Sequence, residues 1–184
     1  MVTGGVFKLQ SHFAQMWNDT DHHLALLITF RCRGTWLHGD ERGSVDRHNN
    51  VFGTPRIPAN EEWLGHNKSV LVGRPSYLTA KRRRIIERAI GETCSIRDWD
   101  LHAINVRTNH VHAVVAAGYS KPGMVLHALK ANATREMREN ACWNHDYSPW
   151  VDKGSKRRLW NERHIQSAID YVLYGQGEEL PEFD

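Results

Sequence analysis

Two histidines separated by one residue, His110 and His112, form the clearest chemical pattern in the sequence. Alternate residues of a β-strand project from the same face, so two imidazoles at this spacing can hold one divalent metal ion. Val111 between them would point to the opposite face, and Val114 and Val115 continue the strand. Because the chain contains 12 histidines, such a pair also arises by chance, and a second feature is needed to give it weight.

A tyrosine on the expected last helix, within residues 162–176, is that second feature. The apolar stripe of this helix centres near Ile165 and Val172. At 100° per residue, Tyr171 then lies about 120° from the centre of the stripe, and Tyr174 lies about 180° away. A tyrosine at the border of the buried face can bring its hydroxyl to a site on the sheet, although ordinary boundary packing also explains its position.

The elements that must position these side chains follow the order β-α-β-β-α-β, with a further helix at the end. Apolar periodicity and capping residues predict strands near 24–30, 99–106, 110–117 and 159–160, helices that begin at Thr79 and Ser120, and a last helix from about Glu162 to Tyr174. This order predicts an α+β, ferredoxin-like fold: a split β-α-β antiparallel sheet with helices on one face, a C-terminal tyrosine-bearing helix and a long insertion after the first strand.

Length and composition set limits on the class of protein. The 184 residues suit a single domain over 1–184, with 40% hydrophobic and 24% charged residues. No apolar run approaches the ~20 residues of a membrane-spanning helix, and the start of the chain does not resemble a signal peptide. The three cysteines, Cys32, Cys94 and Cys142, form no C-x-x-C pair, so neither a zinc site nor a disulfide framework is expected. A cytoplasmic protein without a membrane partner is therefore expected.

Two stretches of the sequence together resemble a known family. Asn109-His110-Val111-His112 after a strand, with Tyr171-Val-Leu-Tyr-Gly175-Gln176 on a late helix, resembles the REP-associated tyrosine transposases, a branch of the single-tyrosine HUH transposases. The stretch from Gly34 to Gly43, with Arg47, is also similar, and the resemblance covers about residues 24–176. It implies an endonuclease and strand transferase that acts on single-stranded DNA near hairpins, as a monomer or a homodimer.

The resemblance also implies roles for individual residues. His110 and His112 would hold one Mg²⁺ or Mn²⁺ ion, and Tyr171 would be the nucleophile. The family's third metal ligand is an amide about one turn after the tyrosine; here that position is Gly175, and the amide of Gln176 comes one residue later. A phenol has a reference pKa of about 10, so a metal that polarises the phosphate is required. The attack would leave a 5′-phosphotyrosine and a free 3′-OH, so that rejoining requires no ATP.

Two dense basic clusters are candidates for contacts with DNA phosphates, although each is also typical of a solvated surface. The residues are Lys81, Arg82, Arg83, Arg84, Lys153, Lys156, Arg157 and Arg158. The Arg82–Arg84 run is expected to point largely away from the core. Trp143, Trp150 and Trp160 beside the second cluster are candidates for stacking on unpaired bases or for core packing, with core packing favoured for Trp160.

The insertion over residues 39–76 is interrupted by glycine, proline and asparagine, which predicts a long irregular segment. Acidic and histidine side chains occur in it or next to it, namely His38, Asp40, Glu41, Asp46, His48 and His66. Their spacing is irregular, so structural or DNA-facing roles are favoured over a second metal site.

Other families with paired histidines fit less well. Val114 occupies the place of the third histidine of histidine-triad hydrolases, and His112 occupies the place of the threonine in two-histidine phosphoesterases. Two alternatives stay open: a metal-hydroxide phosphodiesterase that does not use Tyr171, and a domesticated, catalytically silent binder of structured single-stranded nucleic acid.

Overall fold

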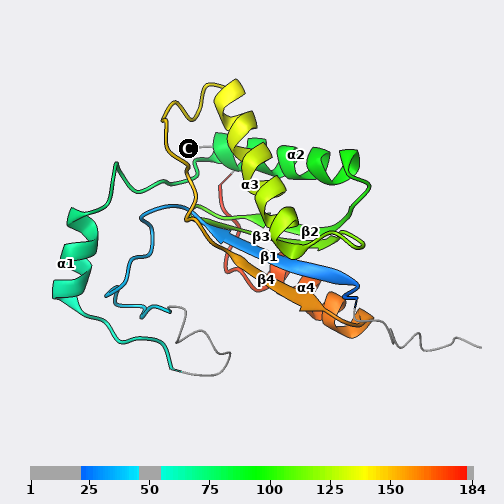
Figure 1. Cartoon of the computed structure of the whole chain (residues 1–184), viewed down its shortest axis with the longest axis horizontal. Coiled ribbons are helices and arrows are strands. Elements are labelled where there is room, and N and C mark those ends of the chain that lie inside the picture. Colours follow the sequence, from blue (N-terminus) through cyan, green and yellow to red (C-terminus); the bar gives the residue numbers. More distant parts are fainter. Residues whose placement is uncertain (1–21, 46–54, 182–184) are drawn as a thin grey trace, which may run out of the picture.

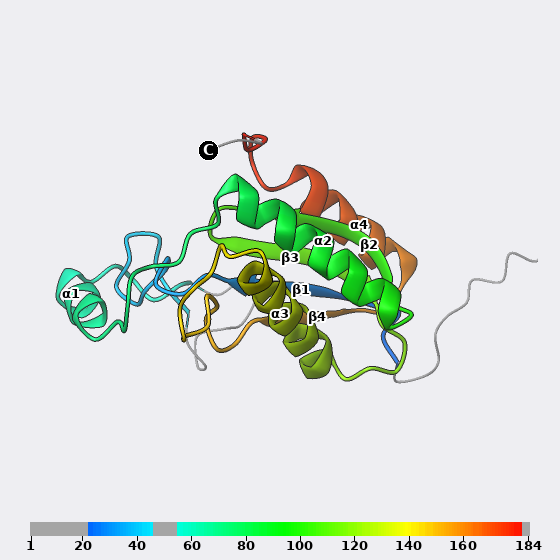
Figure 2. The same cartoon turned by 90° about the horizontal axis from the view of Figure 1, so that it is seen from above.

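A four-stranded antiparallel sheet lies between two layers of helices in the computed structural model, which describes residues 22–45 and 55–181 (Figure 1). The sheet has the strand order β2-β3-β1-β4. Helices α2 and α3 cover one face and α4 lies on the other (Figure 2). The bounds are β1 (Ala25–Arg31), α1 (Glu61–Ser69), α2 (Ala80–Ile96), β2 (Asp100–Val106), β3 (His110–Ala116), α3 (Pro122–Glu139), β4 (Ser155–Leu159) and α4 (Glu162–Tyr174). The predicted ferredoxin-like α+β fold is confirmed.

The face under α2 and α3 holds the larger part of the core. Successive residues of a strand point to opposite faces, so Leu26, Ile28 and Phe30 of β1 all face these helices and are buried. The stripe predicted for α3 is buried in full: Val125, Leu126, Leu129, Ala133 and Met137. These large apolar side chains hold α2 and α3 against the sheet.

The face under α4 is packed by smaller side chains. Ala103, Val114 and Leu159 of the sheet contact Ala168 and Val172 of the helix, all of them buried. The same alternation that points Val114 toward α4 points His110 and His112 to this face. The predicted bounds of α4 match the observed helix, which begins after Asn161 with a side-chain cap on the His164 amide at 2.9 Å.

The structure differs from the predicted element boundaries at α3 and β4, and α2 extends to Ile96 rather than to about Glu92. The N-cap of α3 is Lys121 and not Ser120, and Lys121 makes no side-chain capping bond, because Pro122 with its preset φ begins the helix. Strand β4 lies earlier than the predicted strand near Leu159 and Trp160, so the basic residues 156–158 are on a strand. This strand pairs with β1 at the edge of the sheet, where backbone pairing does not require apolar side chains on both faces.

The segment 39–76 is more regular than predicted, because it contains helix α1 and an isolated bridge between Ser44 and Ile57. Helix α1 has no buried residue, so the sequence carries no apolar stripe that would have predicted it. Its start packs on Gly39, where φ is +89° and a Cβ would lie 2.6 Å from the Leu64 nitrogen. Asp46 and His48 lie outside the described residues.

None of the helices in the described part of the chain is both long and apolar enough to cross a membrane. Cys32, Cys94 and Cys142 are all free thiols, as their spacing predicts.

Candidate active site

The two histidines of β3 lie side by side on the face of the sheet that α4 partly covers. Their ring centroids are 4.7 Å apart at an interplanar angle of 78°. In the pairing of β1 with β3, His110 lies opposite Arg31 and His112 lies opposite Thr29. The spacing of two residues therefore brings both imidazoles to one place, as the sequence predicts.

One nitrogen of each imidazole is engaged by a neighbouring side chain. Nδ1 of His112 lies 2.7 Å from the hydroxyl of Thr29, and Nδ1 of His110 lies 2.6 Å from the amide oxygen of Asn109. An amide oxygen only accepts hydrogen bonds, so Nδ1 of His110 carries the proton and Nε2 keeps its lone pair. Such contacts orient metal-binding histidines. The sequence does not reveal the role of Thr29, which depends on the register of β1 against β3.

Gln176 completes an arrangement of acceptor atoms. Its amide nitrogen donates to the Tyr171 carbonyl at 3.0 Å, and its amide oxygen faces Nε2 of His110 at 3.4 Å. Both atoms of the second contact are acceptors when His110 is neutral. Two lone pairs that face each other at this distance fit a cation bound between them, so the residues present suit a divalent metal ion. Among the described residues, no three His, Cys, Asp or Glu side chains converge on one point, which leaves the amide as the third oxygen or nitrogen donor.

Burial keeps both imidazoles neutral. The pKa of His112 is lowered to about 4, mainly by burial and further by the charge of His110, while the hydrogen bond with Gln176 opposes the shift. Burial also lowers the pKa of His110; the contact with Gln176 opposes this, and the charges of Arg107 and Arg31 add to it. The neutral imidazole is the form that binds a metal ion.

Tyr171 lies against the histidine pair. Its ring centroid is 5.4 Å from that of His112, at 77°. The side chain is 46% exposed, so it is reachable from solvent, whereas Tyr174 is 78% exposed on the far side of α4. Gly175 leaves room for this ring, because a Cβ at that position would lie 3.0 Å from Cδ2 of Tyr171 and 2.8 Å from its carbonyl oxygen.

The segment 175–181 holds Gln176 in place after the end of α4. Arg107, at the turn between β2 and β3, donates to the Glu178 carbonyl at 2.8 Å, and Arg83 of α2 donates to the Pro181 carbonyl. Asn105 of β2 donates to the Val172 carbonyl at 2.9 Å and so ties α4 to the sheet. None of these contacts follows from local sequence, because each joins residues more than 60 positions apart.

The expectation that the Arg82–Arg84 run points away from the core is wrong for Arg83, which is buried. Its neighbours are also used within the fold: Lys81 donates to the Asn140 carbonyl, and Arg82 donates to the carbonyls of Tyr77 and Cys142. The start of α2 is surrounded by the turn after α3 and by segment 175–181, which the periodicity of the helix does not reveal. Lys153, Lys156, Arg157 and Arg158 are all exposed.

The structure decides between the two roles left open for Trp143 and Trp150, and it contradicts the one favoured for Trp160. Trp143 and Trp150 are buried, and Trp150 packs edge to face on Phe30 with centroids 4.8 Å apart, so neither ring face is free for a base. Trp160, for which core packing was favoured, is 43% exposed. It follows the last residue of β4, beyond the strand positions that α4 covers.

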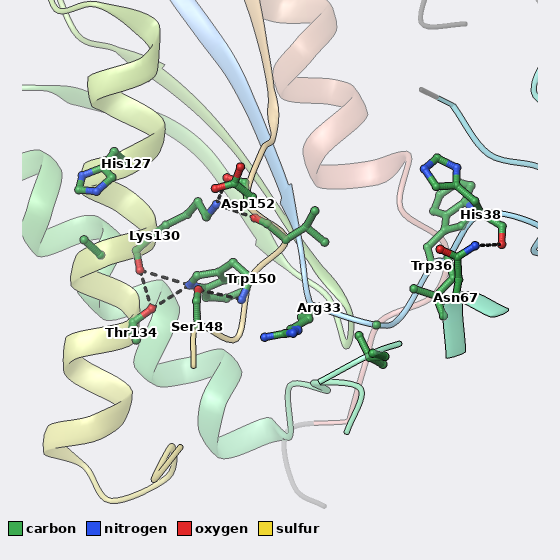
Figure 3. A pocket seen from close by; sticks show the side chains of 15 residues that line it. Arg33, Trp36, His38, Asn67, His127, Lys130, Thr134, Ser148, Trp150 and Asp152 are labelled. Atoms are coloured by element: carbon green, nitrogen blue, oxygen red, sulfur yellow. Dashed lines mark hydrogen bonds between the residues drawn. The ribbon is translucent and has the colours of Figure 1, made fainter. Parts of the chain in front are cut away.

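A cavity of about 660 Å³ lies between α3 and the segment after β1 (Figure 3). Its lining includes Trp36, Lys130 and Asp152, and the Lys130 amino group donates to the Val151 and Asp152 carbonyls at 2.7 and 2.8 Å. The lining includes neither the histidine pair nor Tyr171. The cavity and the histidine site are therefore separate.

Comparisons with known proteins give one family and one solved structure. Residues 66–171, more than half of the chain, match the family described as "Transposase IS200 like". A solved structure of a REP-associated tyrosine transposase bound to a REP hairpin is similar, with 12% identity and a TM-score of 0.46, over 83% of this chain and 68% of that one. No curated protein matches.

Proposed function

The chain belongs to the IS200-like transposase family, and we propose that it is a metal-dependent, single-strand DNA endonuclease and strand transferase with Tyr171 as its nucleophile. The observation that carries this proposal is the convergence on one face of two neutral imidazoles, an amide oxygen and an accessible phenol. Nucleophilic catalysis on a phosphodiester requires an activated oxygen and a means to stabilise the phosphate charge. Both kinds of group meet here.

His110, His112 and Gln176 would hold one Mg²⁺ or Mn²⁺ ion. The lone pairs of Nε2 of His110 and of the Gln176 oxygen face each other at 3.4 Å, which supports a cation between them. When bound, the ion supplies charge stabilisation at the scissile phosphate. Thr29 and Asn109 orient the imidazoles through their Nδ1 atoms.

Tyr171 would form the covalent intermediate. Its phenolic oxygen would attack phosphorus and lose its proton, while the bond from phosphorus to the 3′ oxygen breaks and the 3′ oxygen takes up one proton to leave as a hydroxyl. The product is a 5′-phosphotyrosine, and attack by a 3′-OH reverses the step and joins strands without ATP. The ring contact with His112 and the space left beside Gly175 support this role for Tyr171.

The substrate would be single-stranded DNA with hairpin elements, as for the REP-associated branch, bound by a cytoplasmic monomer or homodimer. The exposed residues Lys153, Lys156, Arg157 and Arg158 on and before β4 support phosphate contacts there. Arg83 contributes less to such contacts than the sequence suggests, because its side chain is buried.

The protein is incubated with labelled single-stranded oligonucleotides that carry hairpins from the DNA flanking its gene, in the presence of either Mn²⁺ or EDTA. Denaturing protein gels then show whether a labelled DNA–protein adduct has formed. A metal-dependent DNA–protein adduct is expected in the wild type and in Tyr174→Phe, and none in Tyr171→Phe. Cleavage without an adduct that survives Tyr171→Phe would instead support a metal-hydroxide phosphodiesterase. Binding without any cleavage would support a catalytically silent binder.

A further inference from the structure

Three guanidinium groups surround the single ring of Trp36. The distances from the ring centroid to Cζ are 4.5 Å for Arg31, 4.9 Å for Arg42 and 5.2 Å for Arg56. We call Arg31, Trp36, Arg42 and Arg56 the Trp36 cluster. Stacking on the indole face stabilises each cation, but the three like charges repel one another.

Negative charge near the cluster balances only part of this repulsion. Asp40 pairs with Arg42 at 2.6 Å, whereas Arg31 and Arg56 form no ion pair with any carboxylate of the described residues. Arg56 donates to the Arg42 carbonyl at 3.1 Å. Burial lowers the pKa of Arg31, and the charges of Arg42 and Arg56 lower it further. A half-buried cation in this setting is stabilised by an anion brought from outside.

The cluster borders the candidate active site. Arg31 is the last residue of β1 and lies opposite His110 on the same face of the sheet, where side chains of paired residues start about 5 Å apart. Trp36 is fixed in turn by a hydrogen bond from its indole nitrogen to the Gly43 carbonyl at 2.7 Å.

We propose that the Trp36 cluster binds the backbone phosphate that neighbours the scissile phosphate in the substrate strand. The inference rests on the proposed function and adds a subsite to it. Guanidinium groups bind a phosphate through two parallel hydrogen bonds, which makes arginine suited to phosphate recognition. Because Arg31 lies opposite His110, a phosphate bound by the Trp36 cluster must be close to the scissile phosphate in the strand.

Binding of a fluorescein-labelled single strand, measured in EDTA so that no cleavage is required, tests the cluster. Arg31→Gln and Arg56→Gln should each weaken binding about tenfold, the effect of one charged hydrogen-bonding contact. Each substitution should also make the plot of log association constant against log salt concentration less steep by about 0.7, the value for one lost phosphate contact on a single strand. Arg56 is exposed, so its substitution does not endanger folding.

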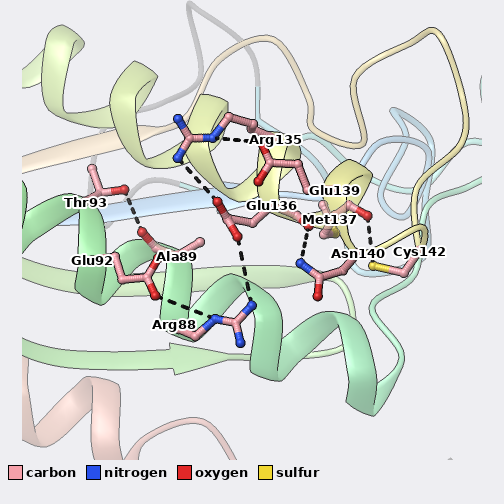
Figure 4. Close-up of polar contacts among 10 residues, drawn as sticks. All are labelled: Arg88, Ala89, Glu92, Thr93, Arg135, Glu136, Met137, Glu139, Asn140 and Cys142. Atoms are coloured by element: carbon pink, nitrogen blue, oxygen red, sulfur yellow. Dashed lines mark hydrogen bonds and ion pairs between the residues drawn. The ribbon is translucent and has the colours of Figure 1, made fainter.

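Arg88→Gln is the matched control. Arg88 lies on α2, on the other face of the sheet, and its charge is already paired with Glu92 and Glu136 (Figure 4). Its substitution removes the same charge and should change affinity less than twofold. If Arg31→Gln and Arg56→Gln weaken binding no more than Arg88→Gln, the subsite is rejected.

A scan with one methylphosphonate at successive positions of the strand locates the phosphate. In the wild type, neutralising the phosphate next to the cleavage position should weaken binding about tenfold, and in Arg31→Gln the same change should have no further effect. Equal sensitivity of wild type and variant at every position would overturn the assignment. If micromolar inorganic phosphate displaces the strand, the assignment is also overturned, because the Trp36 cluster would then be a site for free inorganic phosphate. If the wild-type protein binds the strand but forms no adduct with Mn²⁺, the proposed function is rejected. The effects of Arg31→Gln and Arg56→Gln on binding can still be interpreted, because they are measured without cleavage.

Discussion

The two faces of the sheet are built in different ways. Under α2 and α3, large side chains such as Ile28, Phe30 and Leu129 are fully buried, and an ion pair joins the outer surfaces of the two helices. Under α4, the buried contacts come mainly from small residues such as Ala103 and Ala168, and polar bonds fix the position of the helix and of the segment after it. The first face provides most of the stability, and the second provides the geometry of the site.

This difference predicts that substitutions on the two faces have separable effects. Changes under α2 and α3 should lower the free energy of unfolding and leave the activity of folded molecules unchanged. Changes under α4 should lower activity at little cost in stability. Each of the following variants tests one side of this contrast.

The largest effect is expected for His112→Ala, on the α4 face. Loss of this imidazole removes a metal ligand, and the metal contributes several kcal/mol of charge stabilisation, so adduct formation should fall about 10³-fold or more. The free energy of unfolding should change by only about 1 kcal/mol, the value of the lost hydrogen bond to Thr29. Urea unfolding combined with the adduct assay checks both numbers. A loss of activity that only follows a loss of folded protein would contradict the contrast.

Leu129→Ala tests the other face. Leu129 is fully buried in the stripe of α3, so the substitution should lower the free energy of unfolding by about 2–5 kcal/mol. Adduct formation per folded molecule should stay at the wild-type rate. Leu173→Ala on α4, where the side chain is 45% exposed, is the control and should cost much less in the same urea titration.

Gly175→Ala tests how strongly the site depends on space. The added Cβ would meet the Tyr171 carbonyl at 2.8 Å and its ring at 3.0 Å, so the ring must shift. A displacement of about 1 Å can cost about 10²-fold in rate. Gly91→Ala inside α2, where a Cβ has nothing within 4 Å, should instead stabilise the protein by about 0.5–1 kcal/mol. Equal adduct yields in the two variants would show that the space at Gly175 is not required for activity.

Arg107→Ala should loosen the segment that presents Gln176. The variant loses the bond to the Glu178 carbonyl, and removal of a group that orients a metal ligand costs about 10–100-fold. The loss should appear as a higher Mn²⁺ concentration for half-maximal adduct formation. Arg163→Ala at the exposed start of α4 is the matched control. An unchanged Mn²⁺ dependence in Arg107→Ala would contradict a positioning role.

The smallest effect is expected for Glu136→Gln on the α2–α3 surface. Glu136 pairs with Arg88 at 3.9 Å and with Arg135 at 3.3 Å. Such pairs contribute less than about 1 kcal/mol, and the difference from wild type in thermal unfolding should shrink as salt rises. A loss as large as that of Leu129→Ala would show that polar contacts, and not apolar burial, hold this face together.

Local periodicity predicted the elements that carry the strongest patterns. The stripe of α3, the bounds of α4 and the strand position of the histidine pair all follow from residues within one element. Helix α1 was missed because it buries no side chain and therefore has no apolar stripe. The burial of Arg83 was also missed, because it depends on a segment distant in the sequence. The sequence left the role of Trp150 open for the same reason, since its indole nitrogen bonds to α3.

The sequence by itself determined the fold class, the shared face of His110 and His112, and the different positions of Tyr171 and Tyr174 on their helix, because these depend only on strand and helix periods. The tertiary structure decided what surrounds them. Thr29, Arg31 and Gln176 reach the histidine pair through strand register and through a segment that folds back after α4. Such contacts depend on how distant segments pack, and no local period encodes them.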